Sequence, residues 1–300
     1  MWGGGCVLRK AMQSCVRKLI INNQNSALLL VDIGAWPFHD LLEKYPDRAK
    51  NIGVFEPGTI SLAAGLSLSG IIPTVYGISP FIAQRSLEQL KLDFVYQKIG
   101  GNFIVTGASY DFSTLGYSHY CPEDIPTLKM LPGMEIVTPG SPEEFTALWN
   151  ACKDNGRPTY YRMTDYSNSL SVLCEFGQAT VLKKGTNCTV IAVAETLDKV
   201  WNVCRNEDVT LLYYNTIAPF DRKTLSENCD SGKVLVCTPF YEGSITDEVI
   251  NSLGGRSLRI EECGVPNVVL RNYGTKEEKD QFCGLTEENI TNKLRTLIKR

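Results

Sequence analysis

The stretch NIGVFEPGTISLAAGLSLSG, Asn51 to Gly70, places one carboxylate between two runs of different character. The short apolar run 51–55 is typical of a buried strand, and the small and apolar residues after it are typical of a helix. Pro57 suits the first helical position, and Gly70 suits the position after the last one. Glu56 is therefore expected where a strand ends and a helix begins.

The same alternation continues on both sides of this stretch. Five further apolar runs bounded by Gly, Pro or Asp predict strands at 27–34, 73–78, 102–107, 135–140 and 158–163. Helical patterns separate them, and the clearest is SPEEFTALWNAC, in which Ser141 is the expected N-cap and Glu144 completes a capping box. Strands separated by helices imply a mostly parallel sheet covered by helices on both faces.

A polar segment, 165–187, interrupts the series, and a second series follows it. Its expected elements are strands at 189–194, 209–215, 233–239 and 256–263, with helices at 196–204 and 286–299. We therefore predict an α/β fold of two domains, residues 1–175 and 176–300, each built on a mostly parallel sheet with helices on both faces.

Composition excludes several classes of protein. The net charge is −3 over 300 residues, so nothing favours a nucleic acid or an anionic membrane as a partner. No apolar stretch reaches the roughly 18 residues that a membrane span needs, and the N-terminus does not have the form of a signal peptide. We expect a soluble, cytoplasmic protein.

The 11 cysteines are scattered singly, and only two histidines, His39 and His119, accompany them. Zinc sites and redox dithiols need close, paired ligands, so we expect no metal site on this chain. The cysteines are interpreted as reduced, small apolar side chains.

Two interpretations of Glu56 follow from its position. An acidic residue at a helix N-terminus stabilises the helix by about 0.3–1 kcal/mol. The carboxyl ends of parallel strands are also the edge of the sheet at which open α/β folds bind ligands. Position alone leaves both interpretations open.

Longer segments resemble the pyrimidine-binding domain of the transketolases. The first, 45–97, contains PDR, a glycine, Glu56, an AAGL helix and a phenylalanine before an R-x-x-E-Q-like helix; it is followed by LGYSHYCPEDIPTLKMLPGMEIVTPGSPEEF (115–145) and GRPTYYRM (156–163). The second series of elements, including NTIAPFD and FCGLTEENI, is similar to the C-terminal domain of that family. The resemblance covers about Leu8 to Lys299 and is specific in order and spacing.

The resemblance implies roles for individual residues. Glu56 matches the glutamate that bonds N1′ of the aminopyrimidine of thiamine diphosphate, and Phe81, with Tyr76 as second choice, is expected to stack on that ring. His119 matches the histidine that faces the reacting carbon, and Arg162 matches an arginine that binds the phosphate or distal end of the substrate. Asp32 matches an early aspartate and is a weaker, supporting cofactor-site residue.

Half of the family's cofactor site has no counterpart here. A Gly-Asp-Gly motif, followed by an asparagine, binds the Mg²⁺ that bridges the cofactor's phosphates, and this chain has no Gly-Asp-Gly. The resemblance therefore implies the C-terminal subunit of a split transketolase. It would need an N-terminal subunit that carries the motif, and two copies of each chain would form an α₂β₂ complex with two sites.

The substrate is less well defined. Pro57 replaces the usual glutamine, Leu115 stands where sugar-phosphate transketolases have an aspartate, and VTGASY lacks a frequent histidine. The lost side chains bond sugar hydroxyls, so a ketose donor and an aldehyde acceptor are expected without a named sugar. Two alternatives stay open: the beta subunit of a 2-oxoacid dehydrogenase decarboxylating component, and a catalytically silent scaffold subunit.

Overall fold

A computed structural model describes residues 7–299, so Cys6 lies outside the described residues. Six strands of the first half of the chain and β10 of the second half form a seven-stranded sheet of order β10-β5-β6-β4-β3-β1-β2. Its strands are β1 (Ser26–Leu30), β2 (Ala49–Asn51), β3 (Ile72–Ile78), β4 (Gly101–Thr106), β5 (Glu135–Val137), β6 (Pro158–Arg162) and β10 (Thr216–Ala218). Neighbouring strands are parallel except β10, which pairs antiparallel with β5.

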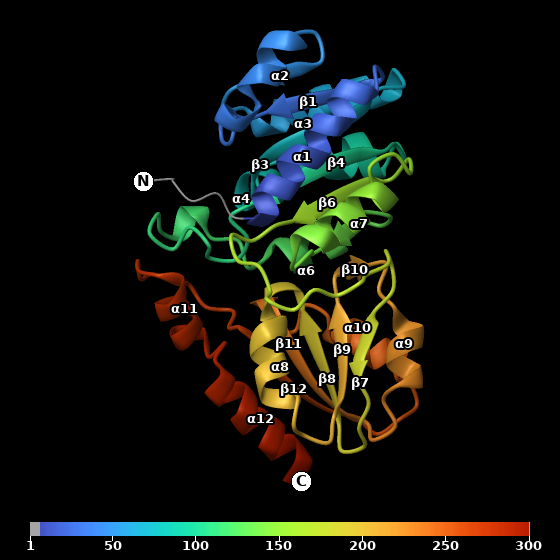
Figure 1. The fold of residues 1–300 in the computed structure, drawn as a ribbon, viewed down its shortest axis with the longest axis vertical. Helices are drawn as coiled ribbons and strands as arrows, with labels where there is room; N and C mark the ends of the chain where they lie inside the picture. The colour runs from blue at the N-terminus through green and yellow to red at the C-terminus, as the bar shows by residue number, and fades with distance from the viewer. Residues whose placement is uncertain (1–6, 300) are drawn as a thin grey trace.

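Helices cover both faces of this sheet (Figure 1). The apolar side chains of α1 (Val7–Asn22), α2 (His39–Lys44) and α7 (Pro142–Cys152) pack on one face. On the other face lie α3 (Glu56–Leu68), α4 (Ser79–Ala83), the π-helical segment η2 (Leu90–Val95) that follows α5 (Leu87–Gln89), and α6 (Asp124–Lys129).

The second half forms a five-stranded sheet of order β12-β11-β8-β9-β7. These strands are β7 (Thr180–Lys183), β8 (Thr189–Val193), β9 (Thr210–Tyr214), β11 (Lys233–Tyr241) and β12 (Arg259–Val265), and only β7 runs antiparallel to its neighbour. Four helices pack on it: α8 (Leu197–Cys204) and α12 (Glu287–Lys299) on one face, α9 (Arg222–Glu227) and α10 (Thr246–Ser252) on the other. Helix α11 (Lys276–Cys283) precedes α12.

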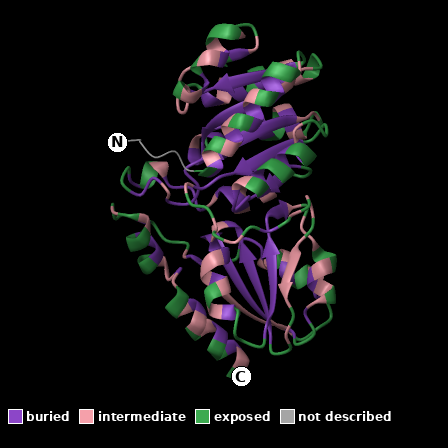
Figure 2. Ribbon diagram, in the orientation of Figure 1, coloured by how far each residue is buried: buried purple, intermediate pink, exposed green. Residues whose placement is uncertain are grey.

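Burial follows the sheets (Figure 2). The inner strands are buried along their length, whereas the edge strand β7 is only partly buried. One apolar cluster continues from the α3 face of the first sheet to the α9 and α10 face of the second. The two halves therefore share a core, and among the described residues no helix is long and apolar enough to cross a membrane.

The α/β class, with two mostly parallel sheets covered by helices, is confirmed. The strand predicted at 51–55 is wrong, because β2 ends at Asn51 and the positive φ of Gly53, 83°, turns the chain out of the sheet. Helix α3 begins one residue earlier than expected, at Glu56. The boundary at 175/176 falls between β6 and β7, yet β10 returns from the second half to the edge of the first sheet.

The start of α7 also departs from the prediction. Ser141 caps the helix, since its hydroxyl accepts from the Glu144 N–H at 3.2 Å. The Glu144 carboxylate, however, accepts from the Gly140 N–H at 2.8 Å instead of completing the capping box at Ser141. Burial raises the pKa of Glu144 to about 7, although that N–H and the Tyr213 hydroxyl donate to the carboxylate.

Candidate functional site

The candidate site lies at the carboxyl ends of the parallel strands β2, β3 and β4. Helix α3 begins at Glu56 after β2, helix α4 follows β3, and the loop after β4 leads to the short helical turn η3 (Tyr117–His119). Because parallel strands end on the same edge of their sheet, these three connections meet there. Glu56, Phe81 and His119, which come from three separate segments, approach one another at this edge.

Glu56 and Phe81 are joined by a residue that the sequence interpretation did not assign. The Glu56 side chain is 2% exposed, and one of its carboxylate oxygens accepts a hydrogen bond of 2.9 Å from the Arg85 guanidinium. The carbon of the same guanidinium lies 4.2 Å from the centroid of the Phe81 ring, a cation–π contact. Arg85 follows Phe81 by four residues and lies in the turn after α4, where its N–H donates to the Pro80 carbonyl at 3.2 Å.

His119 completes this group. Its ring packs edge-on against Phe81 with 5.5 Å between ring centroids, and its Nδ1 lies 3.0 Å from the Ser118 hydroxyl. The imidazole is partly buried. A half-buried imidazole beside an aromatic ring, at the same edge of the sheet as the buried Glu56 carboxylate, can exchange a proton with a ligand bound there.

The loop that carries His119 is held by the second half of the chain. Gly116, with φ of 86°, lies against Tyr273, and a Cβ at Gly116 would come 2.7 Å from the tyrosine ring. The Tyr120 hydroxyl donates to the carbonyl of Ser113 at 2.7 Å and to that of Asn272 at 3.0 Å. The position of His119 therefore depends on segment 271–273 as well as on β4.

Tyr76 does not join this group. Successive residues of a strand point to opposite faces, and in β3 Val75 packs on the α3 side while Tyr76 packs on the α1 side. Its ring is 2% exposed and meets Phe38 edge-on at 6.3 Å. Of the two aromatic residues considered for the pyrimidine ring, only Phe81 lies beside Glu56.

Arg162 is turned into the protein. Its side chain is 1% exposed, and its Nε donates to both oxygens of Asp124 at 2.9 and 3.2 Å. A terminal nitrogen donates to the Ser109 hydroxyl at 2.5 Å, and another lies 3.9 Å from Glu195. Burial alone would lower the pKa of Arg162, but the carboxylates of Asp124 and Glu195 raise it above its usual range. We therefore describe it as a buried link between the two halves of the chain.

Asp32 follows β1 and has a positive φ of 70°. Its backbone N–H donates to the side-chain oxygen of Asn51 at 2.9 Å, and the Asn51 amide donates back to its carboxylate at 3.3 Å. The aspartate thus fixes the end of β2 to the end of β1, shortly before Glu56 in the chain, and its role as a supporting residue stays a prediction.

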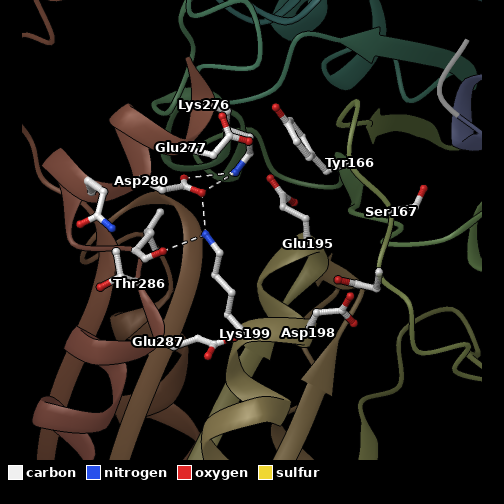
Figure 3. A pocket seen from close by; sticks show the side chains of 13 residues that line it. Tyr166, Ser167, Glu195, Asp198, Lys199, Lys276, Glu277, Asp280, Thr286 and Glu287 are labelled. Atoms are coloured by element: carbon white, nitrogen blue, oxygen red, sulfur yellow. Dashed lines mark hydrogen bonds and ion pairs between the residues drawn. The ribbon is translucent and has the colours of Figure 1, made fainter. Parts of the chain in front are cut away.

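A pocket of about 410 Å³ lies on the other side of Arg162, between segment 166–168 and helices α8, α11 and α12. Figure 3 shows its charged side chains turned toward one another. Lys276 bonds both oxygens of Asp280 at 3.0 and 3.1 Å, and Lys199 also bonds Asp280 and the Leu285 carbonyl. Glu195 reaches from this wall to Arg162 at 3.9 Å, and the Tyr110 hydroxyl donates to Asp280 at 2.6 Å, so the side chains around the pocket link the second half of the chain to the first.

Sequence reasoning missed two residues that organise the site. Arg85 lies in the R-x-x-E-Q-like segment, and its spacing of four from Phe81 was a usable signal. Asp124 accepts from Arg162, from the Tyr160 hydroxyl at 3.0 Å and from the Ser79 hydroxyl at 3.0 Å. An acidic residue in a polar loop gave no indication of such burial.

Among the described residues no group of three or more acidic, histidine or cysteine side chains could hold a metal ion. The ten described cysteines are free thiols, eight of them buried. Burial raises the pKa of the half-buried Cys174 to about 12 and that of Cys283 to about 11. Their environment is that of apolar filling side chains.

Known proteins provide an independent comparison. A family model described as transketolase, pyrimidine binding domain, matches residues 8–165. An uncharacterized 33.6 kDa protein in the fasciation locus of Rhodococcoides fascians is 31% identical over 278 residues, which cover 91% of this chain and 89% of that one. One of the chains of the apulose-4-phosphate transketolase of Phocaeicola vulgatus is 24% identical over 307 residues, 97% of each chain.

The fold has a solved counterpart of the same extent. A structure described as a split gene transketolase in an inactive beta4 tetramer superposes with a TM-score of 0.85 and covers 99% of both chains at 22% identity. The similarity of fold therefore extends over both halves of the chain.

Proposed function

Because the chain belongs to the transketolase family, we propose that it is the C-terminal subunit of a split, thiamine-diphosphate-dependent transketolase. In this proposal it transfers a two-carbon ketol unit from a ketose to an aldehyde, and only when an N-terminal subunit is present. One observation carries the proposal: a buried carboxylate, an aromatic ring and a histidine meet at the strand ends of a pyrimidine-binding domain.

The residues fit the pyrimidine half of thiamine diphosphate. Glu56 is a buried carboxylate, and a planar cation already packs on the Phe81 ring beside it. A flat nitrogen heterocycle needs the same two partners, a carboxylate in its plane and an aromatic face. The sequence has no Gly-Asp-Gly, so we assign Mg²⁺ and the diphosphate mainly to the N-terminal subunit.

Each residue then has a stated task. When bound, thiamine diphosphate supplies a thiazolium carbon that becomes a nucleophile toward the ketose carbonyl. Glu56 would bond N1′ of the aminopyrimidine, Phe81 would stack on the ring, and His119 would exchange a proton with the oxygen of the reacting carbon. The low exposure of Glu56 strengthens its hydrogen bond relative to one in water.

The substrate is proposed as a ketose and an aldehyde, and the name of the Phocaeicola vulgatus relative, which specifies a sugar phosphate, supports a sugar substrate. The first domain buries Arg162 in its pair with Asp124, so the anionic end of a phosphorylated substrate would need a cation from elsewhere. We propose an α₂β₂ assembly; the beta4 tetramer described as inactive supports both self-association of such subunits and dependence on a partner.

The test uses the chain together with a candidate N-terminal subunit that carries Gly-Asp-Gly. The mixture should bind thiamine diphosphate, turn over and elute as two copies of each chain, whereas this chain alone should do none of these. Glu56→Gln should leave the complex intact and slow exchange of the cofactor's thiazolium proton, followed by NMR, by about 10²–10⁴. Glu288→Gln, at the start of α12, is the control for a helix-terminus effect.

Two results would contradict the proposal. Tight, Mg²⁺-dependent binding of the cofactor by this chain alone would remove the need for a second subunit. Equal exchange rates in wild type and Glu56→Gln would leave Glu56 with a structural role only, and a complex without turnover would favour the silent scaffold.

A further inference from the structure

The Arg85 guanidinium touches both groups that the proposed cofactor needs. It donates to Glu56 at 2.9 Å, and its carbon lies 4.2 Å from the Phe81 centroid. Among the described residues, no other carboxylate or carbonyl accepts a hydrogen bond from this guanidinium. Arg85 therefore lies between the carboxylate and the ring, and these two contacts hold its head in place.

A guanidinium and a protonated aminopyrimidine have the same recognition features. Both are flat and delocalised, both donate N–H bonds in their plane to a carboxylate, and both pack their face on an aromatic ring. A ring that stacks on Phe81 and bonds Glu56 would need the space that the guanidinium now fills. The two occupants exclude each other, because the guanidinium already contacts both the carboxylate and the ring that the pyrimidine requires.

The exposed fractions of the Glu56 and Arg85 side chains indicate which of the two moves. The Glu56 side chain is 2% exposed and lies at the start of α3, whereas the Arg85 side chain is 46% exposed. Arginine reaches this place through a long, flexible chain, and its backbone N–H is tied to the Pro80 carbonyl at 3.2 Å. The head of Arg85 can therefore swing into solvent while its backbone stays in place.

We propose that in the unassembled subunit Arg85 occupies the place of the cofactor's aminopyrimidine, and that it must swing out before Glu56 can bond the ring. This inference rests on the proposed function of Glu56 and Phe81. Arg85 is then a positioning residue: it keeps a buried carboxylate paired while no partner chain is bound, and it sets the apparent affinity for the pyrimidine. If the closed form holds about nine of every ten molecules, the apparent affinity is about tenfold weaker than the intrinsic one.

The experiment uses the full chain without its partner and the free pyrimidine half of thiamine, 4-amino-5-hydroxymethyl-2-methylpyrimidine, as the probe. Binding is followed by saturation-transfer NMR for wild type, Arg85→Ala, Arg85→Lys and Glu56→Gln. Arg85→Ala should bind the probe about tenfold more tightly, and Arg85→Lys should be intermediate, since an ammonium pairs with Glu56 but offers no flat face.

Adding a free guanidinium compound to Arg85→Ala tests whether the variant binds more tightly because the place of the guanidinium is empty or because the structure has changed. Methylguanidinium should compete with the probe in Arg85→Ala and restore the weak binding of wild type, but it should have little effect on wild type itself. Arg222→Ala is the matched control, because Arg222 is also a half-exposed arginine paired with a glutamate, Glu248, at 2.8 Å. It should leave probe binding unchanged.

The outcomes separate this inference from the proposed function. If Arg85→Ala binds the probe no more tightly than wild type does, while Glu56→Gln loses binding, the role of Arg85 is overturned and the pyrimidine site stays in place. Binding that is indifferent to Glu56→Gln overturns both. No measurable binding by Arg85→Ala also overturns the inference, because removing the guanidinium should open the place it fills.

Discussion

Removal of the Asp124 carboxylate tests the burial of Arg162. In Asp124→Ala the Arg162 guanidinium would keep its hydrogen bond to Ser109 and its ion pair with Glu195 at 3.9 Å, but it would lose both hydrogen bonds to its nearest carboxylate. Breaking a pair in which both side chains are at most 1% exposed costs about 3–5 kcal/mol, because one charge is left buried without compensation. For a chain of this length that corresponds to a fall in Tm on the order of 10 °C.

Differential scanning calorimetry of single and double variants measures this cost. Arg162→Met should destabilise the protein by a similar amount, and Asp124→Leu with Arg162→Met should recover most of the loss, since an apolar pair of similar volume replaces the ions. Arg222→Met, at an exposed pair, should cost less than about 1 kcal/mol. A change in Tm below about 2 °C for Asp124→Ala, with loss of substrate affinity in a stable Arg162→Met complex, would refute the reasoning and restore Arg162 as a substrate ligand.

Two further predictions concern pH and the histidine loop. Burial raises the pKa of Glu144 from an ordinary value of 4.5 to about 7. The stability that this carboxyl contributes is therefore fully present below about pH 4.5 and is lost as the pH rises through 7. The loss in the free energy of unfolding between these pH values is about 3 kcal/mol. Glu144→Gln should therefore flatten the fall in urea-unfolding free energy between these pH values, and an unchanged slope would contradict this. Gly116→Ala should lower the free energy of unfolding by about 1–2 kcal/mol, because alanine disfavours a positive φ. It should also lower the activity of the complex more than Gly53→Ala does, because the Cβ added at Gly53 meets nothing within 4 Å.

The sequence predicted the layers of the fold well because buried parallel strands are continuous apolar runs, and each is separated by a helix with clear end signals. It could not predict β10, whose three residues pair with β5 only after the chain has crossed into the second half and returned. The wrongly predicted strand at 51–55 has a different cause. Val54 and Phe55 are apolar, but they are 68% and 61% exposed, and apolar composition alone does not distinguish a buried strand from an exposed loop.

The sequence predicts the place of a candidate site residue well where the order of strands and helices alone determines that place. Glu56 follows a strand at the edge where parallel strands end, so its placement needed only the order of elements. The face of Tyr76, the second choice for the pyrimidine ring, depends on the period of two within β3, which a continuously apolar strand does not display; the structure places it on the α1 side. Arg162 ends a strand as expected, but its pairing with Asp124 depends on a contact across 38 residues.

The position of His119 depends on both halves of the chain. A histidine on a loop would sample many positions, and the loop here is fixed by Tyr273 over Gly116 and by the Tyr120 bond to Asn272. Both anchors belong to the segment that leads into α11, which Lys276 and Asp280 hold beside Lys199 of α8. The second domain thus acts on the proposed chemistry through the histidine loop, although none of its described residues forms a hydrogen bond or ion pair with Glu56 or Phe81. It follows that substitutions in segment 271–280 should alter proton transfer at His119 before they alter pyrimidine binding at Glu56.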